Sequence, residues 1–435
     1  MPETQPVNSA ERLVTWPEER ADAMSLALIL SLGLSAAYAV QRAGLGVPWW
    51  LIAQSLGMSA LIQAAPSVWP SVPGGEGDRA GGSRFDSDAA RLLAGAVALI
   101  ALAACSRAFG FPLGPLTALA GLAMAVRPLA RWWRAASAQR RSIVSVGVLL
   151  AMWGADAIWS QGYLAPLLLE DLAATGYANQ DTLFHVAISR MLQTYGRVTT
   201  GVDGVSPLTY YVGSHWLLSR WADLTGAPVL DTYRVAYPVV LVPLFVRVLA
   251  GASSALRRVL HETDAAATPP VTGWPWLTGA GLVGLTPLAL RSRLPLWPVV
   301  NSESHLIALV VALLALWLLL DAWRAGLVTR VRAGDVGGGA GIVAALLLGC
   351  IVAMGWLKVS VMLMFVLGLG YVALRTVLWR SALPASLLVI GSIVSLLTYR
   401  AVSPPALATN LRTGDFFVRF VPPTLVPIFV AAVYG

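Results

Sequence analysis

The sequence has little charge for its length. Asp, Glu, Lys and Arg make up 12% of the 435 residues, whereas 57% are hydrophobic, and the mean hydropathy is +0.70. A soluble domain of this size would need far more charge on its surface, so the composition excludes that class and indicates a polytopic membrane protein. Lysine is the scarcest charge, because Lys358 is the sole lysine among 30 basic residues.

Several chemical motifs are also absent. The two cysteines, Cys105 and Cys350, are too few for a disulfide framework. The chain has no Walker loop, Gly-x-Ser-x-Gly elbow, His-Glu-x-x-His, Cys-x-x-Cys or dinucleotide fingerprint, which leaves soluble nucleotide-sugar or ATP chemistry without a site. The polar, acidic stretch 1–22 is unlike a secretory signal peptide, so we expect the first apolar segment to be a retained span.

Apolar runs dominate what is present. Because a membrane helix needs about 20 mainly apolar residues, we expect an all-α, polytopic transmembrane helical bundle of about 12 spans, forming one integral membrane domain over 1–435. The expected spans lie near 23–41, 48–66, 90–107, 112–127, 143–160, 235–254, 272–290, 304–321, 339–354, 358–375, 382–400 and 422–435. The Gly- and Ser-rich segment 66–89 is expected to be a flexible cytoplasmic loop. The chain ends within its last apolar segment, which is typical of an incomplete sequence.

Arginines predict the orientation. Short loops rich in arginine face the cytoplasm, and four such clusters agree on one alternation. They contain Arg127 to Arg141, Arg257 and Arg258, Arg324 to Arg332, and Arg375 and Arg380. The net charge of +8 is therefore a topology signal, and nucleic acid is not an expected partner. We expect an integral protein of a bacterial inner membrane with a cytoplasmic N-terminus and with 161–232 as a large outer-face loop.

The outer loop carries an acid and an imidazole one helical turn apart. Asp181 and His185 open a segment, 181–195, in which Leu183, Val186, Ala187 and Met191 recur at helical spacing. A helix here would place Asp181 and His185 on one face. Asp181 could then act as a general base or metal ligand beside His185. The alternative is that Asp181 caps an interfacial helix.

A second short helix is expected over 207–223. Tyr211, His215 and Leu218 would lie along one stripe, which could line the same cleft as Asp181. The alternative is an amphipathic helix lying flat on the membrane, with Trp216 and Trp221 at the headgroup level, as tryptophans often are.

Further ionisable groups fall at the outer ends of later spans. Glu303 and His305 precede an apolar run. Glu303 is either a second carboxylate of the site or a negative charge that stabilises the N-terminus of the following helix. Lys358 lies between apolar segments, so it either binds an anion such as a lipid phosphate or snorkels at a helix end. Arg400 and Arg412, in or beside the last outer loop, are suited to phosphate recognition or are ordinary solvated arginines.

The chain resembles the GT-C superfamily of polytopic membrane glycosyltransferases. The resemblance rests on the dozen expected spans, on Asp181-x-x-x-His185 in a large outer loop, on the Tyr-containing helix with His215, and on basic residues at later outer helix ends. It covers most of the chain as architecture, but only about 179–226 as motif. The first outer loop, 42–46, lacks the acid common in that superfamily, so Asp181 would serve from a later loop.

The resemblance implies transfer of a sugar from a polyprenyl-phosphate donor to an acceptor on the outer face. Partners would be that lipid-linked donor and membrane lipids, with a divalent cation, Mg2+ or Mn2+, as the cofactor to expect at Asp181. The expected catalytic residues are Asp181, His185, His215 and Glu303. The expected substrate-binding residues are Tyr211, His305, Lys358, Arg400 and Arg412. The alternatives are an enzyme like the O-antigen ligases and polymerases, and a secondary transporter or flippase.

Overall fold

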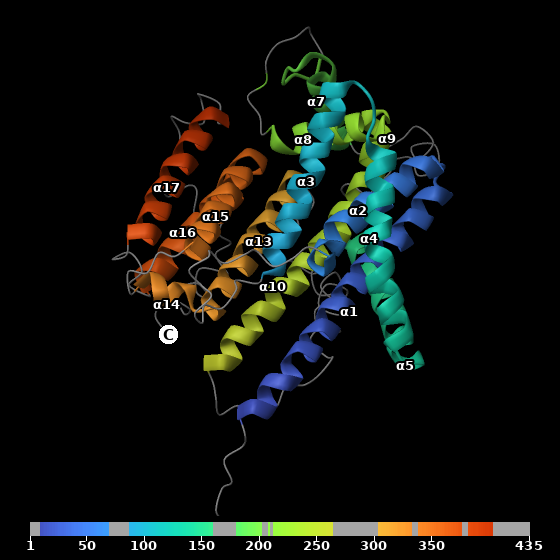
Figure 1. The fold of residues 1–435 in the computed structure, drawn as a ribbon. Helices are drawn as coiled ribbons and strands as arrows, with labels where there is room; N and C mark the ends of the chain where they lie inside the picture. Colours follow the sequence, from blue (N-terminus) through green and yellow to red (C-terminus); the bar gives the residue numbers. More distant parts are fainter. Residues whose placement is uncertain are drawn as a thin grey trace, which may run out of the picture.

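The computed structural model describes residues 9–68, 87–159, 180–201, 208, 212–263, 303–332, 338–375 and 382–402. Regular structure in these ranges is helical throughout, and they contain no strand, which confirms the predicted all-α class. The elements, labelled in Figure 1, are α1 (Ser9–Gly44), α2 (Trp49–Val68), α3 (Asp88–Phe109), α4 (Gly114–Ala135), α5 (Ala138–Trp159), α7 (Gln180–Tyr195), α8 (Gly213–Thr225), α9 (Val229–Val235), the π-helix η2 (Ala236–Leu241), α10 (Val242–Thr263), α13 (Glu303–Arg324), α14 (Leu327–Arg332), α15 (Gly338–Leu357), α16 (Val359–Arg375) and α17 (Ala382–Val402).

The long helices are suited to a membrane. In the described part of the chain, five segments are long and apolar enough to cross one: Trp49–Val68, Asp88–Phe109, Val229–Leu256, Ser304–Arg324 and Gly339–Leu357. Two shorter apolar helices, Val359–Ala373 and Leu383–Thr398, accompany them. This supports an integral membrane protein. The predicted spans 272–290 and 422–435, and most of the predicted loop 66–89, lie outside the described residues.

One predicted boundary differs from the structure. The membrane segment expected to begin at 235 begins at Val229, which follows Pro228. The helix α4, which contains the fourth expected span, also continues past residue 127 to Ala135, because the arginines beyond the apolar run are good helix formers. By contrast, the expected division near Gly355 to Lys358 is confirmed, since Lys358 alone separates α15 from α16.

Glycines allow α2 and α4 to cross closely. A Cβ built on Gly121 of α4 would collide with the carbonyl oxygen of Gly57 of α2, and a Cβ on Gly57 would collide with Ala118. Ala60, Ala64 and Ala125 continue this contact as a small buried cluster. Small residues at such spacing let membrane helices pack backbone to backbone.

Charged residues join three helices at one end of the bundle. The hydroxyl of Ser87, which caps α3, donates to Asp321 Oδ2 at 2.9 Å, and Arg258 Nη2 lies 3.8 Å from Asp321 Oδ1. The start of α3 therefore lies beside the last turns of α10 and α13. Each of these helix ends was predicted from the arginine pattern to lie on the same side.

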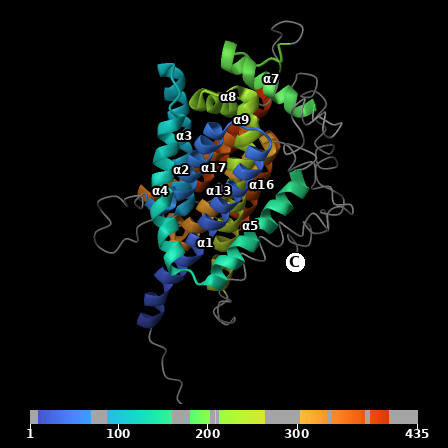
Figure 2. The same ribbon diagram turned by 90° about the vertical axis from the view of Figure 1, so that its right-hand side faces the viewer.

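The short helices α7 and α8 lie at the opposite end of the bundle, as Figures 1 and 2 show. The end of α3 reaches them: the Ser106 hydroxyl lies 3.0 Å from the backbone oxygen of Asp223 in α8. The 22 residues of α3 span about 33 Å at 1.5 Å per residue. The two ends of the bundle are thus separated by roughly the thickness of a hydrocarbon core. We call the end with α7 and α8 the α7–α8 end.

Candidate functional site

The expected helix at 181–195 is observed as α7, Gln180–Tyr195. The expected helix at 207–223 begins later, because α8 starts at Gly213 and ends at Thr225. Gly226 follows it in the left-handed conformation, with φ 72°, which glycine adopts readily and which ends the helix.

The two helices run in parallel along one seam. His185 contacts His215, and Gln193 contacts Asp223; both pairs are separated by 30 positions in the sequence. Because the separation in sequence is the same at both contacts, the two helices run in the same direction. Eight helical residues cover about 12 Å, so the seam has two polar contact points about 12 Å apart. We call them the histidine pair and the Asp223 network.

The histidine pair is the central feature of the predicted site. His185 Nδ1 lies 2.8 Å from His215 Nε2, and the ring centroids are 4.9 Å apart. His185 is 7% exposed and His215 is fully buried. The Ser214 hydroxyl lies 3.4 Å from His215 Nδ1. Two predicted site residues, 30 positions apart, are therefore brought into direct contact.

The buried face of α7 combines polar and apolar residues. His185, Ser189 and Gln193 follow each other at intervals of four residues, and Ser189 Oγ lies 3.2 Å from Tyr233 Oη of α9. Leu183, by contrast, is 46% exposed. Val186, Ala187 and Met191 are half-buried, whereas Ile188 and Leu192 are buried beside the polar residues, so the side of α7 that faces the bundle carries both kinds of residue.

On α8, the two described residues of the expected stripe, His215 and Leu218, are buried, whereas Tyr211 lies outside the described residues. Trp221, which the alternative of a surface-lying helix placed at the headgroup level, is 3% exposed and belongs to the hydrophobic core. It lies on the inner side of α8, so this helix is embedded against the bundle.

The start of α8 abuts the break between α15 and α16. A Cβ on Gly213 would lie 2.8 Å from the carbonyl carbon and oxygen of Trp356, so the absence of a side chain lets the two backbones meet. Lys358, half-buried, follows two residues later. Its ammonium group is within electrostatic range of the His305 imidazole in the first turn of α13. Lys358, His305 and the histidine pair therefore lie on elements that converge at the α7–α8 end.

The remaining predicted site residues are placed only in part. The structure describes only the backbone of three of them: Asp181 in α7, Glu303 at the first position of α13, and Arg400 near the end of α17. Arg412 lies outside the described residues altogether. Asp181 precedes His185 by one helical turn, as predicted.

The described residues contain no group of three His, Cys, Asp or Glu side chains arranged to hold a metal ion. The two imidazoles of the histidine pair use the nitrogens that face each other for their mutual hydrogen bond. Mg2+ and Mn2+ prefer oxygen ligands, so these nitrogens are not a site for either. A divalent cation at Asp181 stays a prediction, and no step below depends on it.

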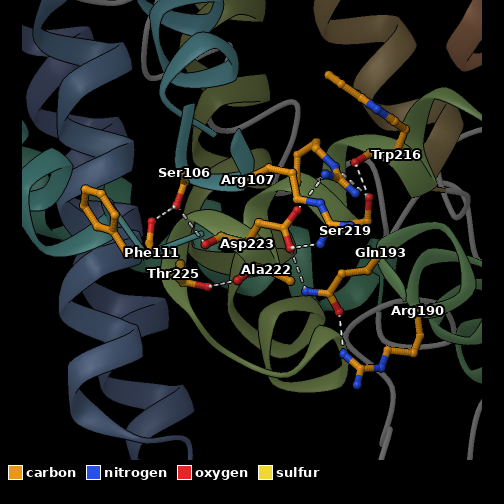
Figure 3. A network of polar contacts seen from close by, with 11 residues as sticks. Ser106, Arg107, Phe111, Arg190, Gln193, Trp216, Ser219, Ala222, Asp223 and Thr225 are labelled. Carbon is orange, nitrogen blue, oxygen red and sulfur yellow. Dashed lines mark hydrogen bonds and ion pairs between the residues drawn. The ribbon is translucent and has the colours of Figure 1, made fainter. Parts of the chain in front are cut away.

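The Asp223 network was not foreseen from the sequence. Arg220 Nη1 lies 2.8 Å from Asp223 Oδ2, and Gln193 Nε2 donates to Asp223 Oδ1 at 3.0 Å. Arg190 Nη1 donates to Gln193 Oε1 at 2.6 Å, and Arg107 Nη1 lies 3.9 Å from Asp223 Oδ1. Figure 3 shows Gln193 between Arg190 and the Asp223 carboxylate, with Arg107 also close to Asp223.

Burial shapes the electrostatics of this network. Partial burial lowers the pKa of the Arg220 guanidinium, and the negative charge of Asp223 opposes that shift. Arg107 adds a smaller effect in the same direction as burial. Among the described residues, Asp223 is the one carboxylate in ion-pair contact with Arg107 and Arg220.

A cavity of about 690 Å3 opens beside the network. Its walls come from the turn between α3 and α4, one face of α7, and the junction of α8 and α9, and they include Arg107, Arg190, Gln193 and Asp223. Ser106 stabilises the turn between α3 and α4 that forms one wall. Its hydroxyl lies 2.7 Å from the Phe111 carbonyl and accepts a hydrogen bond from the Leu113 N–H. The cavity is large enough for a small organic ligand.

The sequence contained a weak local signal for this cavity. Arg190 and Gln193, like Arg220 and Asp223, are three residues apart, so each pair shares a helix face. Nothing in the sequence connected these pairs with Arg107, which lies more than 80 positions earlier. That contact exists because α3 ends beside α8.

No protein-family model matches the chain, and neither a characterised protein nor a solved structure matches it.

Proposed function

We propose that the protein is a membrane glycosyltransferase of the GT-C type, with about twelve spans in a bacterial inner membrane. It would move a sugar from a polyprenyl-phosphate donor to an acceptor at the α7–α8 end, on the outer face. The observation that carries this proposal is the buried contact between His185 and His215. Two imidazoles in direct contact can pass a proton from one ring to the other.

The proposed reaction is a displacement at the anomeric carbon. An acceptor hydroxyl attacks that carbon, the bond from the carbon to the donor phosphate oxygen breaks, and polyprenyl phosphate leaves with the bonding electrons. The hydroxyl proton passes to a base. We assign Asp181 as that base, because it lies one helical turn before His185 on α7.

The histidine pair would orient Asp181 and take up the proton that Asp181 receives from the acceptor hydroxyl. A neutral imidazole donates through one nitrogen and accepts through the other, so the hydrogen bond between His185 and His215 makes the two rings one unit. Accepting a proton at one ring changes which nitrogen donates to the other. Glu303, at the first position of α13, is assigned as a second acid.

Positive charge would bind the donor phosphate. Lys358 lies at the break between α15 and α16, where the backbone of α8 begins beside Trp356. We assign Lys358, with Arg412, to the phosphate that becomes the leaving group. His305, within electrostatic range of Lys358, and the residues Tyr211 and Arg400 would line the same space.

Sugar transfer in proteoliposomes tests the proposal. The purified protein is reconstituted with radiolabelled polyprenyl-phosphate hexoses, and released polyprenyl phosphate and new glycoside are measured. Asp181→Asn should lower turnover by about 10²- to 10⁴-fold, as expected for loss of a general base. Lys358→Gln should chiefly raise the KM for the donor.

Asp231→Asn is the matched control, because it makes the same change of charge in α9 at the same end of the bundle. Its turnover should equal that of the wild type. Unchanged turnover in Asp181→Asn would remove Asp181 from the chemistry. If the histidine variants were also fully active, the proposal would fail.

Transport is a second candidate, favoured by one observation. Arg247 lies inside α10, is 2% exposed, and has Asp88 as an electrostatic partner. Buried ionisable groups in membrane helices often mark transport pathways. Flux of polyprenyl-phosphate hexose across vesicles without turnover, abolished by Arg247→Gln, would favour this candidate over the transferase.

A further inference from the structure

We propose that the cavity beside Asp223 is a binding site for a phosphate group, separate from the histidine pair. This inference stands independently of the transferase proposal. It rests on the cavity, on the arginines around it, and on their charge balance.

The charges around the cavity do not cancel. Arg107 and Arg190 line the cavity together with Asp223. Arg220, which is not a lining residue, pairs with Asp223 at 2.8 Å, so the four side chains carry a surplus of two positive charges. A phosphate monoester carries about 1.5 to 2 negative charges at pH 7. One bound phosphate would therefore neutralise the cluster.

The arginines differ in how fully they are engaged. Arg220 is held tightly, 2.8 Å from Asp223, and its side chain is 12% exposed. Arg107 is 3.9 Å from the same carboxylate and is 51% exposed. Arg190 is exposed, and its guanidinium group donates to the neutral amide of Gln193. Asp223 and Gln193 thus position two guanidinium groups that retain donors for an oxyanion.

The guanidinium groups come from different helices. Arg107 lies in the last turn of α3, whereas Arg190 lies in the third turn of α7, and both line the cavity. Arginine binds phosphate through two parallel N–H donors, which gives both affinity and orientation. Apolar residues, among them Phe111, Pro112 and Leu230, form other parts of the wall. A phosphate attached to an organic body fits this combination.

The cavity is distinct from the histidine pair. Asp223 follows His215 by eight residues of α8, which is about 12 Å along the helix. Of α7, the cavity is lined by Val186, Arg190 and Gln193, while His185 faces His215. The histidine pair and the cavity beside Asp223 are therefore two separate locations along the contact between α7 and α8.

Calorimetric titration of the detergent-solubilised protein with inorganic pyrophosphate tests the site. The wild type should bind saturably, and added salt should weaken binding because charge drives it. Arg107→Gln and Arg190→Gln should each weaken binding about tenfold or more, and the double variant should show none. Arg131→Gln is the matched control. It removes an exposed arginine of α4, at the end far from the cavity, and should bind like the wild type.

A second arm distinguishes the source of the phosphate. Native mass spectrometry counts the phosphatidic acid retained by wild type and variants from nanodiscs with and without that lipid. Binding of pyrophosphate that depends on the two arginines indicates a water-soluble phosphate compound. Retention of phosphatidic acid with the same dependence, without pyrophosphate binding, indicates a lipid headgroup. Either result supports the site.

Two results would overturn it: binding of neither probe by the wild type, or equal binding by the wild type and the Arg107→Gln/Arg190→Gln variant. Melting temperatures of the variants provide the check on folding. Since both arginines are exposed or half-exposed, these temperatures should match that of the wild type.

Discussion

A neutral imidazole has one N–H and one acceptor nitrogen, so the contact of 2.8 Å between His185 and His215 links the tautomers of the two rings. If His185 donates, His215 carries its hydrogen on Nδ1, toward Ser214. If His215 donates from Nε2, its Nδ1 accepts from the Ser214 hydroxyl, 3.4 Å away. The sequence indicated both histidines as site residues and suggested a shared cleft. The direct bond between them required the fold.

Replacing either histidine with glutamine should destabilise the protein by about 1–3 kcal/mol, because a buried partner loses its hydrogen bond. Replacing both should cost less than the sum of the two single changes, with a coupling of about 1 kcal/mol. Denaturant or thermal unfolding of His185→Gln, His215→Gln and the double variant, followed by tryptophan fluorescence, measures this. Strict additivity would contradict a direct interaction.

At the scale of helices, α7 packs through polar and apolar residues together. Residues 185, 189 and 193 bond in turn to α8, α9 and α8 again, and Ile188 and Leu192 are buried beside them. Hydrophobic spacing predicted that a helix exists here, and it does. The spacing did not show which neighbours the helix meets, because its buried hydrogen bonds join residues far apart in the sequence. For α2 and α4, the sequence held the small residues, but it did not show that they face each other.

Gly121→Ala should destabilise the protein by about 1–3 kcal/mol, since the new methyl group must displace the backbone of α2 at Gly57. Gly368→Ala in α16 is the matched control, because no atom lies within 4 Å of its added Cβ. Its stability should stay equal or rise slightly, as expected for replacing a helical glycine. Melting temperatures in detergent compare the two. A neutral Gly121→Ala would show that the helices do not cross at this contact.

At the scale of the whole molecule, the bundle has two chemically different ends. One carries the ion pair of Arg258 and Asp321, which joins α10, α13 and the start of α3. The other carries the histidine pair and the Asp223 network. The alternation of basic loops predicted which helix ends lie together, and these contacts agree with it. The cytoplasmic assignment of the first end is still a prediction.

Cysteine labelling in cells tests that orientation. With Cys105 and Cys350 replaced by alanine, Tyr195→Cys at the end of α7 should react with a membrane-impermeant maleimide in intact cells. Gln139→Cys, at the start of α5, should react only after the membrane is permeabilised. Both positions are exposed, so a difference in labelling reports which side of the membrane each position faces. The reverse pattern would place the histidine pair in the cytoplasm.

The sequence by itself determined the helical class, the helix from Gln180 to Tyr195, and the break at Lys358. These follow from local causes: apolar length, helical periodicity, and a lone charge between two apolar runs. Only the tertiary structure decided that His185 meets His215, that Arg107 reaches Asp223, and that a cavity lies between α3, α7 and α8. These contacts join residues 30 to more than 100 positions apart, and helix packing and buried hydrogen bonds determine which of them meet.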